Sequence, residues 1–135
     1  MKYLAAYLVT LSALAALDFL WLGLVAKKYY ALWIGHLLAA QPDMATAMLF
    51  YALFACGLVL FAVVPGAVVR SWRQTLSAAA LYGFFTYMTY ELTNLATLHE
   101  WPPRLAVLDI GWGMVMCVGA AASGRLAVKW ALPRR

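Results

Sequence analysis

Charge is scarce in this chain, and acidic charge is the scarcest. The 135 residues include ten Lys or Arg and only five Asp or Glu. Cysteine occurs only at Cys56 and Cys117, with no Cys-x-x-Cys pair, so both residues indicate apolar packing rather than thiol redox chemistry. The sequence also has no nucleotide-binding loop and no basic stripe interleaved with aromatic residues. Nucleic acid is therefore excluded as a partner.

Apolar residues dominate instead. They make up 67% of the chain, and the mean hydropathy of +0.83 is far above the range of soluble domains. A bilayer core needs about 20 consecutive apolar residues per helix. Four stretches meet this length, at 3–26, 44–69, 76–98 and 105–127. The sequence predicts a single transmembrane domain over 1–135, an all-α four-helix bundle whose main partner is the lipid bilayer.

The basic residues are divided unequally between the two sides of the predicted bundle. One side carries seven of them: Lys2, Arg70, Arg73, Arg125, Lys129, Arg134 and Arg135. The other side carries three: Lys27, Lys28 and Arg104. Cytoplasmic loops are enriched in Lys and Arg, so we expect a multi-pass protein of the cell inner membrane with both termini in the cytoplasm. The net charge of +5 then reflects orientation and contact with anionic lipid.

The first connection is the longest and is predicted to lie in the membrane interface. Lys27, Lys28, Tyr29 and Tyr30 are typical headgroup anchors, and 31–38 is compatible with a short amphipathic helix on the surface. Asp43 is placed to cap the start of the second span. Pro65 marks the expected end of that span.

Three acidic residues lie inside the apolar spans. An ionisable group there costs roughly 2.5–3.5 kcal/mol on insertion scales, and such groups usually mark functional sites. Asp18 lies eight residues before the end of the first span, and Glu91 lies seven before the end of the third. Asp109 lies four residues after the start of the fourth, which runs in the opposite direction. All three acids are therefore predicted at one depth, as one site in the non-cytoplasmic half.

Other side chains are predicted to join these acids. Tyr87 and Asn94 share a helical stripe with Glu91, and the polar arc of this helix is expected to face the bundle interior or a wet cavity. Segments 17–23 and 108–113 resemble each other, each with Asp and Trp three residues apart. Trp21 and Trp112 are therefore expected to donate an indole N–H across to an acid.

A metal site is an alternative use of the same residues. Carboxylates with Asn94 suit a hard cation, and adding His99 or His36 would suit zinc, manganese or iron. The sequence has neither a His-x-x-x-His pair nor a Glu-x-x-His motif. A divalent metal held by Asp18, Glu91, Asp109 and His99 thus stays a candidate cofactor without a motif to support it.

The run of residues 89–98, Thr-Tyr-Glu-Leu-Thr-Asn-Leu-Ala-Thr-Leu, with the two Leu-Asp-x-x-Trp segments, resembles a family of small bacterial integral membrane proteins. This family is known as domain of unknown function 2177, and the similarity extends over nearly the whole chain. The resemblance implies four helices in a bacterial inner membrane. It implies no activity.

Three functions are compatible with the predicted site. The acids bind a proton, a cation or a small ligand in transport or sensing, where a transport path would need a homo-oligomer. Alternatively, a membrane enzyme acts on a lipid or other amphiphile, with the carboxylates as metal ligands or as general acid and base. The third alternative is a non-catalytic subunit with a structural polar core. The sequence favours binding over catalysis, because it supplies no nucleophile motif.

Overall fold

The computed structural model describes residues 1–131, which form long helices joined by short turns. The first two elements are α1 (Lys2–Leu20), which runs on as a π-helical turn, η1 (Trp21–Val25), and the short helix α2 (Lys27–Ile34). A 3-10 turn, η2 (Gly35–Leu37), precedes α3 (Met44–Leu58), which continues through a second π turn, η3 (Val59–Val63), into α4 (Val64–Val68). The last two helices are α5 (Trp72–Thr97) and α6 (Pro103–Trp130). The predicted all-α fold is confirmed, since these described residues contain no strand.

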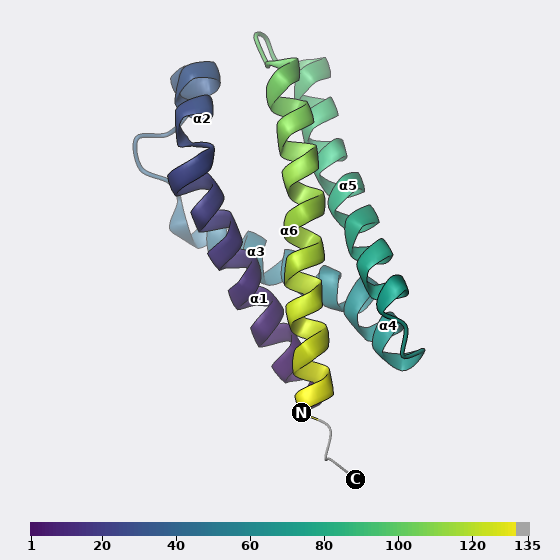
Figure 1. Cartoon of the computed structure of the whole chain (residues 1–135). Coiled ribbons are helices and arrows are strands. Elements are labelled where there is room, and N and C mark those ends of the chain that lie inside the picture. Colours follow the sequence, from purple (N-terminus) through teal and green to yellow (C-terminus); the bar gives the residue numbers. More distant parts are fainter. Residues whose placement is uncertain (132–135) are drawn as a thin grey trace.

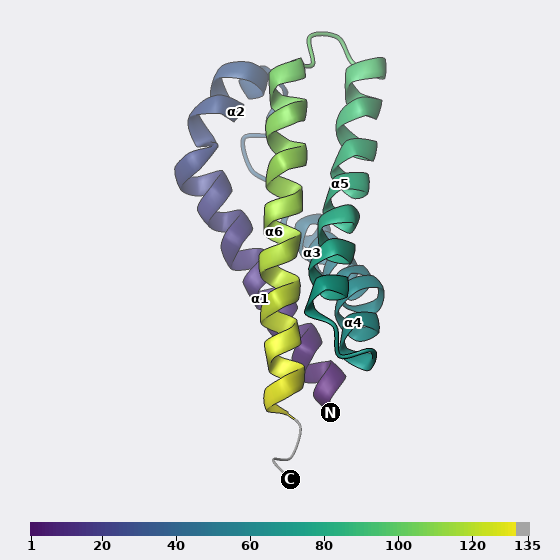
Figure 2. The ribbon, with the colours of Figure 1, turned by 45° about the vertical axis from the view of Figure 1, so that its right-hand side comes forward.

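The helices give the molecule two distinct ends (Figure 1). The N-terminus, the turn between α4 and α5 and the last turn of α6 lie at one end, which we call the terminal end. The short helix α2 and the turn between α5 and α6 lie at the other, which we call the loop end. Helix α6 runs antiparallel to both α1 and α5 and packs between them (Figure 2).

Three helical segments are long and apolar enough to cross a membrane: Lys2–Val25, Met44–Val68 and Pro103–Trp130. Helix α5 has 26 residues, which is ample length for a span, but its composition is more polar than that of the other three. The four observed segments follow the four predicted stretches closely. The two largest differences are at the start of α5, which begins at Trp72 rather than 76, and at the end of α6, which continues to Trp130.

Helix α3 starts at the residue that its N-cap predicts. The Asp43 carboxylate accepts hydrogen bonds from the backbone N–H groups of Ala45 and Thr46, at 3.0 and 3.3 Å, so the predicted cap is confirmed. The hydrogen bond from the Thr46 hydroxyl and those from the two amides hold the pKa of Asp43 below its ordinary value. At the other end, the span passes the expected stop at Pro65, which stands in the first turn of α4, where proline is tolerated.

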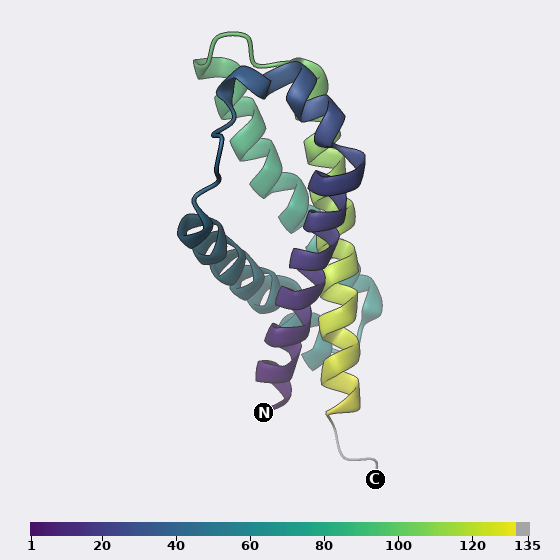
Figure 3. The same ribbon diagram turned by 90° about the vertical axis from the view of Figure 1, so that its left-hand side faces the viewer.

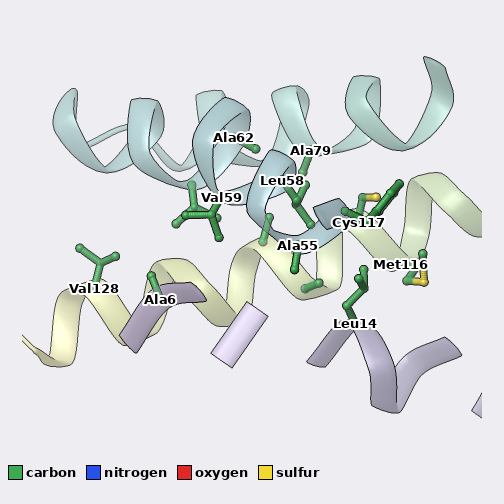
Figure 4. Close-up of a cluster of buried hydrophobic side chains, with 14 residues drawn as sticks. Ala6, Leu14, Ala55, Leu58, Val59, Ala62, Ala79, Met116, Cys117 and Val128 are labelled. Atoms are coloured by element: carbon green, nitrogen blue, oxygen red, sulfur yellow. The ribbon is translucent and has the colours of Figure 1, made fainter. Parts of the chain in front are cut away.

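Helix α3 is inclined steeply to the others and begins partway down the bundle, after the chain has descended from α2 (Figure 3). Two hydroxyls attach it to its neighbours: Tyr7 of α1 donates to the Ala52 carbonyl at 3.1 Å, and Tyr82 of α5 donates to the Phe54 carbonyl at 3.2 Å. Helix α3 and the other long helices share one core, which consists mainly of small and aliphatic side chains (Figure 4). Cys117 lies in this core and Cys56 is exposed; neither forms a disulfide.

Glycine allows the closest approach between α5 and α6. A Cβ atom on Gly83 would lie 2.3 Å from the carbonyl oxygen of Gly113, and a Cβ on Gly113 would lie 2.4 Å from the Tyr87 ring. Gly111 differs, because a Cβ there would have no neighbour within 4 Å. Only some of the small residues of α6 are therefore needed for packing.

The polar arc of α5 differs from expectation. Thr89, Thr93 and Thr97 are exposed rather than hidden in the bundle. Each hydroxyl donates to the carbonyl four residues earlier, at 2.6, 2.5 and 2.7 Å. A threonine that bonds to its own helix needs no partner from another, so this side of α5 can face apolar surroundings.

Candidate functional site

The π turn η1 determines which side chains meet at the loop end. It is closed by a hydrogen bond from the Ala26 N–H to the Trp21 carbonyl at 2.7 Å, and it directs the chain from α1 into α2. As a result, Tyr30 of α2 reaches α6 and its hydroxyl donates to the Asp109 carboxylate. The Trp21 indole in turn donates to the Tyr30 oxygen at 3.4 Å.

Asp18 is bound from two other helices. The Tyr51 hydroxyl of α3 donates to Oδ2, and the Trp112 indole of α6 donates to Oδ1 at 3.3 Å. The rings of Trp21 and Trp112 are stacked, with centroids 4.7 Å apart and planes at 4°. The two similar segments thus meet face to face. Trp112 donates directly to an acid as the spacing predicts, whereas Trp21 is connected to Asp109 through Tyr30.

Glu91 is the most deeply buried of the three acids, at 0% exposed, against 8% for Asp18 and 5% for Asp109. Its Oε2 accepts a hydrogen bond from the Trp101 indole at 2.8 Å. Its Oε1 is buried without a hydrogen-bond partner. A buried carboxyl oxygen that lacks a donor is costly, so Glu91 is the least satisfied of the three acids.

A cavity of about 480 Å³ opens between α1, α2, α5 and α6 beside these acids. Its wall includes both aspartates, and the complete lining is Asp18, Leu22, Lys27, Tyr30, Ala31, Ile34, Leu38, Tyr87, Tyr90, Asp109 and Trp112. A second cavity of about 360 Å³ lies between α3 and α5 and shares Tyr87 and Tyr90 with the first. The larger cavity therefore combines two carboxyl groups, aromatic faces and an aliphatic wall from α1 and α2.

The charges at the rim belong to α2 and the loop end. Lys27 is exposed and lines the mouth of the larger cavity. His36 and Glu100, both exposed, form an ion pair at 3.7 Å. Burial and the hydrogen bond to Asp109 raise the pKa of the Tyr30 phenol, so its hydroxyl remains a donor across the physiological pH range.

The structure gives the predicted residues different positions. Four of them, Asp18, Tyr87, Asp109 and Trp112, line the cavity. Trp21 stacks on Trp112, and Glu91 is buried and bound by Trp101. Asn94 is half-buried beside Tyr90 and does not line it.

The histidines do not join the acids. His99 is exposed, and His36 pairs with Glu100. Within residues 1–131, no group of three or more His, Cys, Asp or Glu side chains is arranged to hold a metal ion. The geometry therefore adds no support to the metal alternative.

Sequence reasoning missed three hydrogen-bond donors to the acids. Tyr30 has the sequence context of a headgroup anchor, but it points inward to Asp109. Tyr51 lies in an otherwise apolar span, and Trp101 lies in the turn before two prolines. Depth could have indicated Tyr51, which stands seven residues into its span, close to the level of the acids, where a buried carboxyl requires a donor. Tyr30 and Trp101 lie outside the predicted spans, so depth gave no signal for them.

The fold defines a helical membrane protein with several spanning segments and no soluble domain among its described residues. The chain belongs to the family described as predicted membrane protein (DUF2177), whose match covers residues 3–126. The resemblance noted in the sequence is thereby confirmed. No curated protein and no solved structure matches the chain.

Proposed function

We propose that this protein binds a small organic cation in the cavity between α1, α2, α5 and α6, as a transport or sensing element of a bacterial inner membrane. The observation that carries the proposal is the joint presence of Asp18 and Asp109 on the wall of one 480 Å³ cavity with four aromatic side chains. Carboxylates attract an ammonium group, and aromatic faces add cation–π attraction that strengthens when water is excluded. The lining holds two carboxyl groups against one lysine, Lys27, so an ammonium group is the ligand chemistry that we assign to it.

The aliphatic part of the lining supports a ligand with a hydrocarbon portion. One side of the cavity, formed by α2 and the turns that flank it, is aliphatic. Its side chains are Leu22, Ala31, Ile34 and Leu38. Small-molecule sites are typically mostly apolar with a few polar groups that fix orientation. An alkylammonium ion matches this division, with its charged group toward the aspartates and its chain toward α2.

Glu91 has no ligand contact in the proposal. One of its oxygens is bound by the Trp101 indole, the other is buried without a hydrogen-bond partner, and the residue does not line the cavity.

The membrane arrangement is part of the same proposal. Helix α5 is taken as the fourth span because its length suffices and its threonine hydroxyls are satisfied within the helix. We assign the terminal end to the cytoplasm because the sequence predicts more basic residues there than at the loop end. Two of the residues in that count, Arg134 and Arg135, lie outside the described residues. Cysteines introduced at Ser71 and at Glu100, in a variant without Cys56 and Cys117, would be labelled from opposite sides of the membrane. Labelling of both from one side would contradict four spans.

Binding can be tested by calorimetric titration of hexyltrimethylammonium into the protein in nanodiscs of neutral lipid. We expect saturable binding that weakens about tenfold in Asp18→Asn and in Asp109→Asn, because each removes a charged partner.

The matched control is Glu100→Gln, an exposed acid at the same end that does not line the cavity. This variant should bind hexyltrimethylammonium like the wild type. Hexanol, which carries no charge, should bind equally to the wild type and to all the variants. Equal binding of hexyltrimethylammonium by the wild type and the double variant Asp18→Asn/Asp109→Asn would overturn the proposal. So would an absence of saturable binding to a folded wild type, which would leave the polar network with a structural role.

A further inference from the structure

A separate cavity, of about 430 Å³, lies at the terminal end of the molecule, away from the acids. It is formed where α4, the start of α5 and the end of α6 converge (Figure 2). Its lining is Ala67, Arg70, Trp72, Arg125, Val128 and Lys129. Three of these six side chains are cationic, and none is acidic.

The positive charge of this cavity has no internal countercharge among the described residues. The five acids of the chain are Asp18, Asp43, Glu91, Glu100 and Asp109, and none of them lines the cavity. Within 1–131 the one ion pair joins His36 to Glu100 at the loop end. The cavity is therefore an electropositive recess of the type that attracts an anion.

Arg125 is the central observation because it is a buried cation. It is 8% exposed, and its guanidinium lies over the Trp72 ring with Cζ 5.4 Å from the ring centroid. Its one hydrogen bond to the protein runs from Nη1 to the Thr75 hydroxyl at 3.4 Å. A guanidinium has five N–H donors, and a buried charge is costly unless it is paired and hydrogen-bonded. Most of its donors are thus available to a ligand in the cavity.

We propose that this recess is a binding site for a phosphate group, held by Arg125 with Arg70 and Lys129 around it. The planar donor fork of arginine matches two phosphate oxygens, while lysine adds a point charge. Trp72 is 41% exposed and Trp130 is 79% exposed, which places two interface-seeking indoles at this end of the bundle. A headgroup of an anionic phospholipid would meet the recess at that level, and basic recesses between helices on the cytoplasmic side bind such headgroups. Free phosphate has the same chemistry but no acyl chains.

The experiment measures lipid retention by native mass spectrometry after the protein is released from nanodiscs containing phosphatidylglycerol and phosphatidylcholine in equal amounts. We expect the wild type to retain phosphatidylglycerol preferentially, and Arg125→Gln to reduce this retention about tenfold. Because Arg125 is buried, its variant could fail to fold, so Arg70→Gly is the second variant. Arg70 has φ 55, a backbone conformation that glycine adopts without strain, so this change removes a charge from the lining without disfavouring the turn.

Arg73→Gln is the matched control, since Arg73 is exposed near the same turn but does not line the recess. It should retain phosphatidylglycerol like the wild type. If Arg73→Gln loses as much as Arg70→Gly, or if both lipids are retained equally, the recess does not select the phosphate of an anionic lipid and the proposal is overturned. A further arm adds millimolar inorganic phosphate: unchanged retention assigns the site to lipid. If phosphate displaces the lipid from the wild type, and if this displacement depends on Arg70, the recess is a site for free phosphate.

Discussion

Replacing Gly83 by alanine should separate α5 from α6 and destabilise the fold. The new Cβ would lie 2.3 Å from the Gly113 carbonyl oxygen, whereas ordinary contact begins at 3.4 Å, so the two backbones must move apart by about 1 Å. Overpacking of this kind costs about 1–3 kcal/mol. The matched variant is Gly111→Ala, where the Cβ meets nothing within 4 Å. Both variants gain the same helix propensity, about 1 kcal/mol, which cancels in the comparison.

The assay is equilibrium unfolding in mixed micelles with a rising mole fraction of sodium dodecyl sulfate. Gly83→Ala should be less stable than Gly111→Ala by about 1–3 kcal/mol, a difference of about 5- to 150-fold in the unfolding equilibrium constant. Equal stability of the two alanine variants would mean that α5 and α6 do not meet at Gly83, and the reasoning about their packing would be refuted.

Three further perturbations test the polar contacts. Trp101→Phe leaves Glu91 buried without any donor and should cost about 1–3 kcal/mol in the same unfolding assay, and adding Glu91→Leu should recover most of that loss. Tyr30→Phe should cost about 1 kcal/mol, because its hydroxyl donates to a buried carboxylate, whereas Tyr29→Phe, at an exposed phenol, should leave stability unchanged. The pKa of Asp43 is held below its ordinary value of 3.8, so its cap stabilises α3 above that pH and is lost as the pH falls through the lower folded-state pKa. Hydrogen exchange at the two capped amides should accelerate in that acid range, and an unchanged rate would show that Asp43 does not cap the helix.

Much of the fold followed from hydropathy, because an apolar run of fixed length has few alternatives in a bilayer. The start of α3 also followed from local chemistry at Asp43. The polarity of α5 was harder to interpret. Its threonines looked like a buried arc, but each hydroxyl bonds to its own backbone, an option that periodicity alone cannot distinguish from a partner on another helix.

The three acids of the candidate site could be predicted from the sequence, but most of the side chains that donate hydrogen bonds to them could not. The depth of Asp18, Glu91 and Asp109 could be counted along the chain. The contribution of Tyr30 depends on the π turn at Trp21–Val25, and no sequence pattern marked that turn. Likewise, nothing in the sequence indicated that α3 would cross the bundle steeply and bring Tyr51 to Asp18.

The stacked indoles of Trp21 and Trp112 limit which parts of the molecule can move. With 4.7 Å between the ring centroids and nearly parallel planes, nothing fits between them, so α1 and α6 keep a fixed register at the level of the acids. We therefore expect α1 and α6 to stay fixed relative to each other when other helices move. Any widening of the cavity must then come from its other two walls, the short helix α2 and α5. The indole pair would remain spectroscopically constant during such a motion and would serve as an internal reference for it.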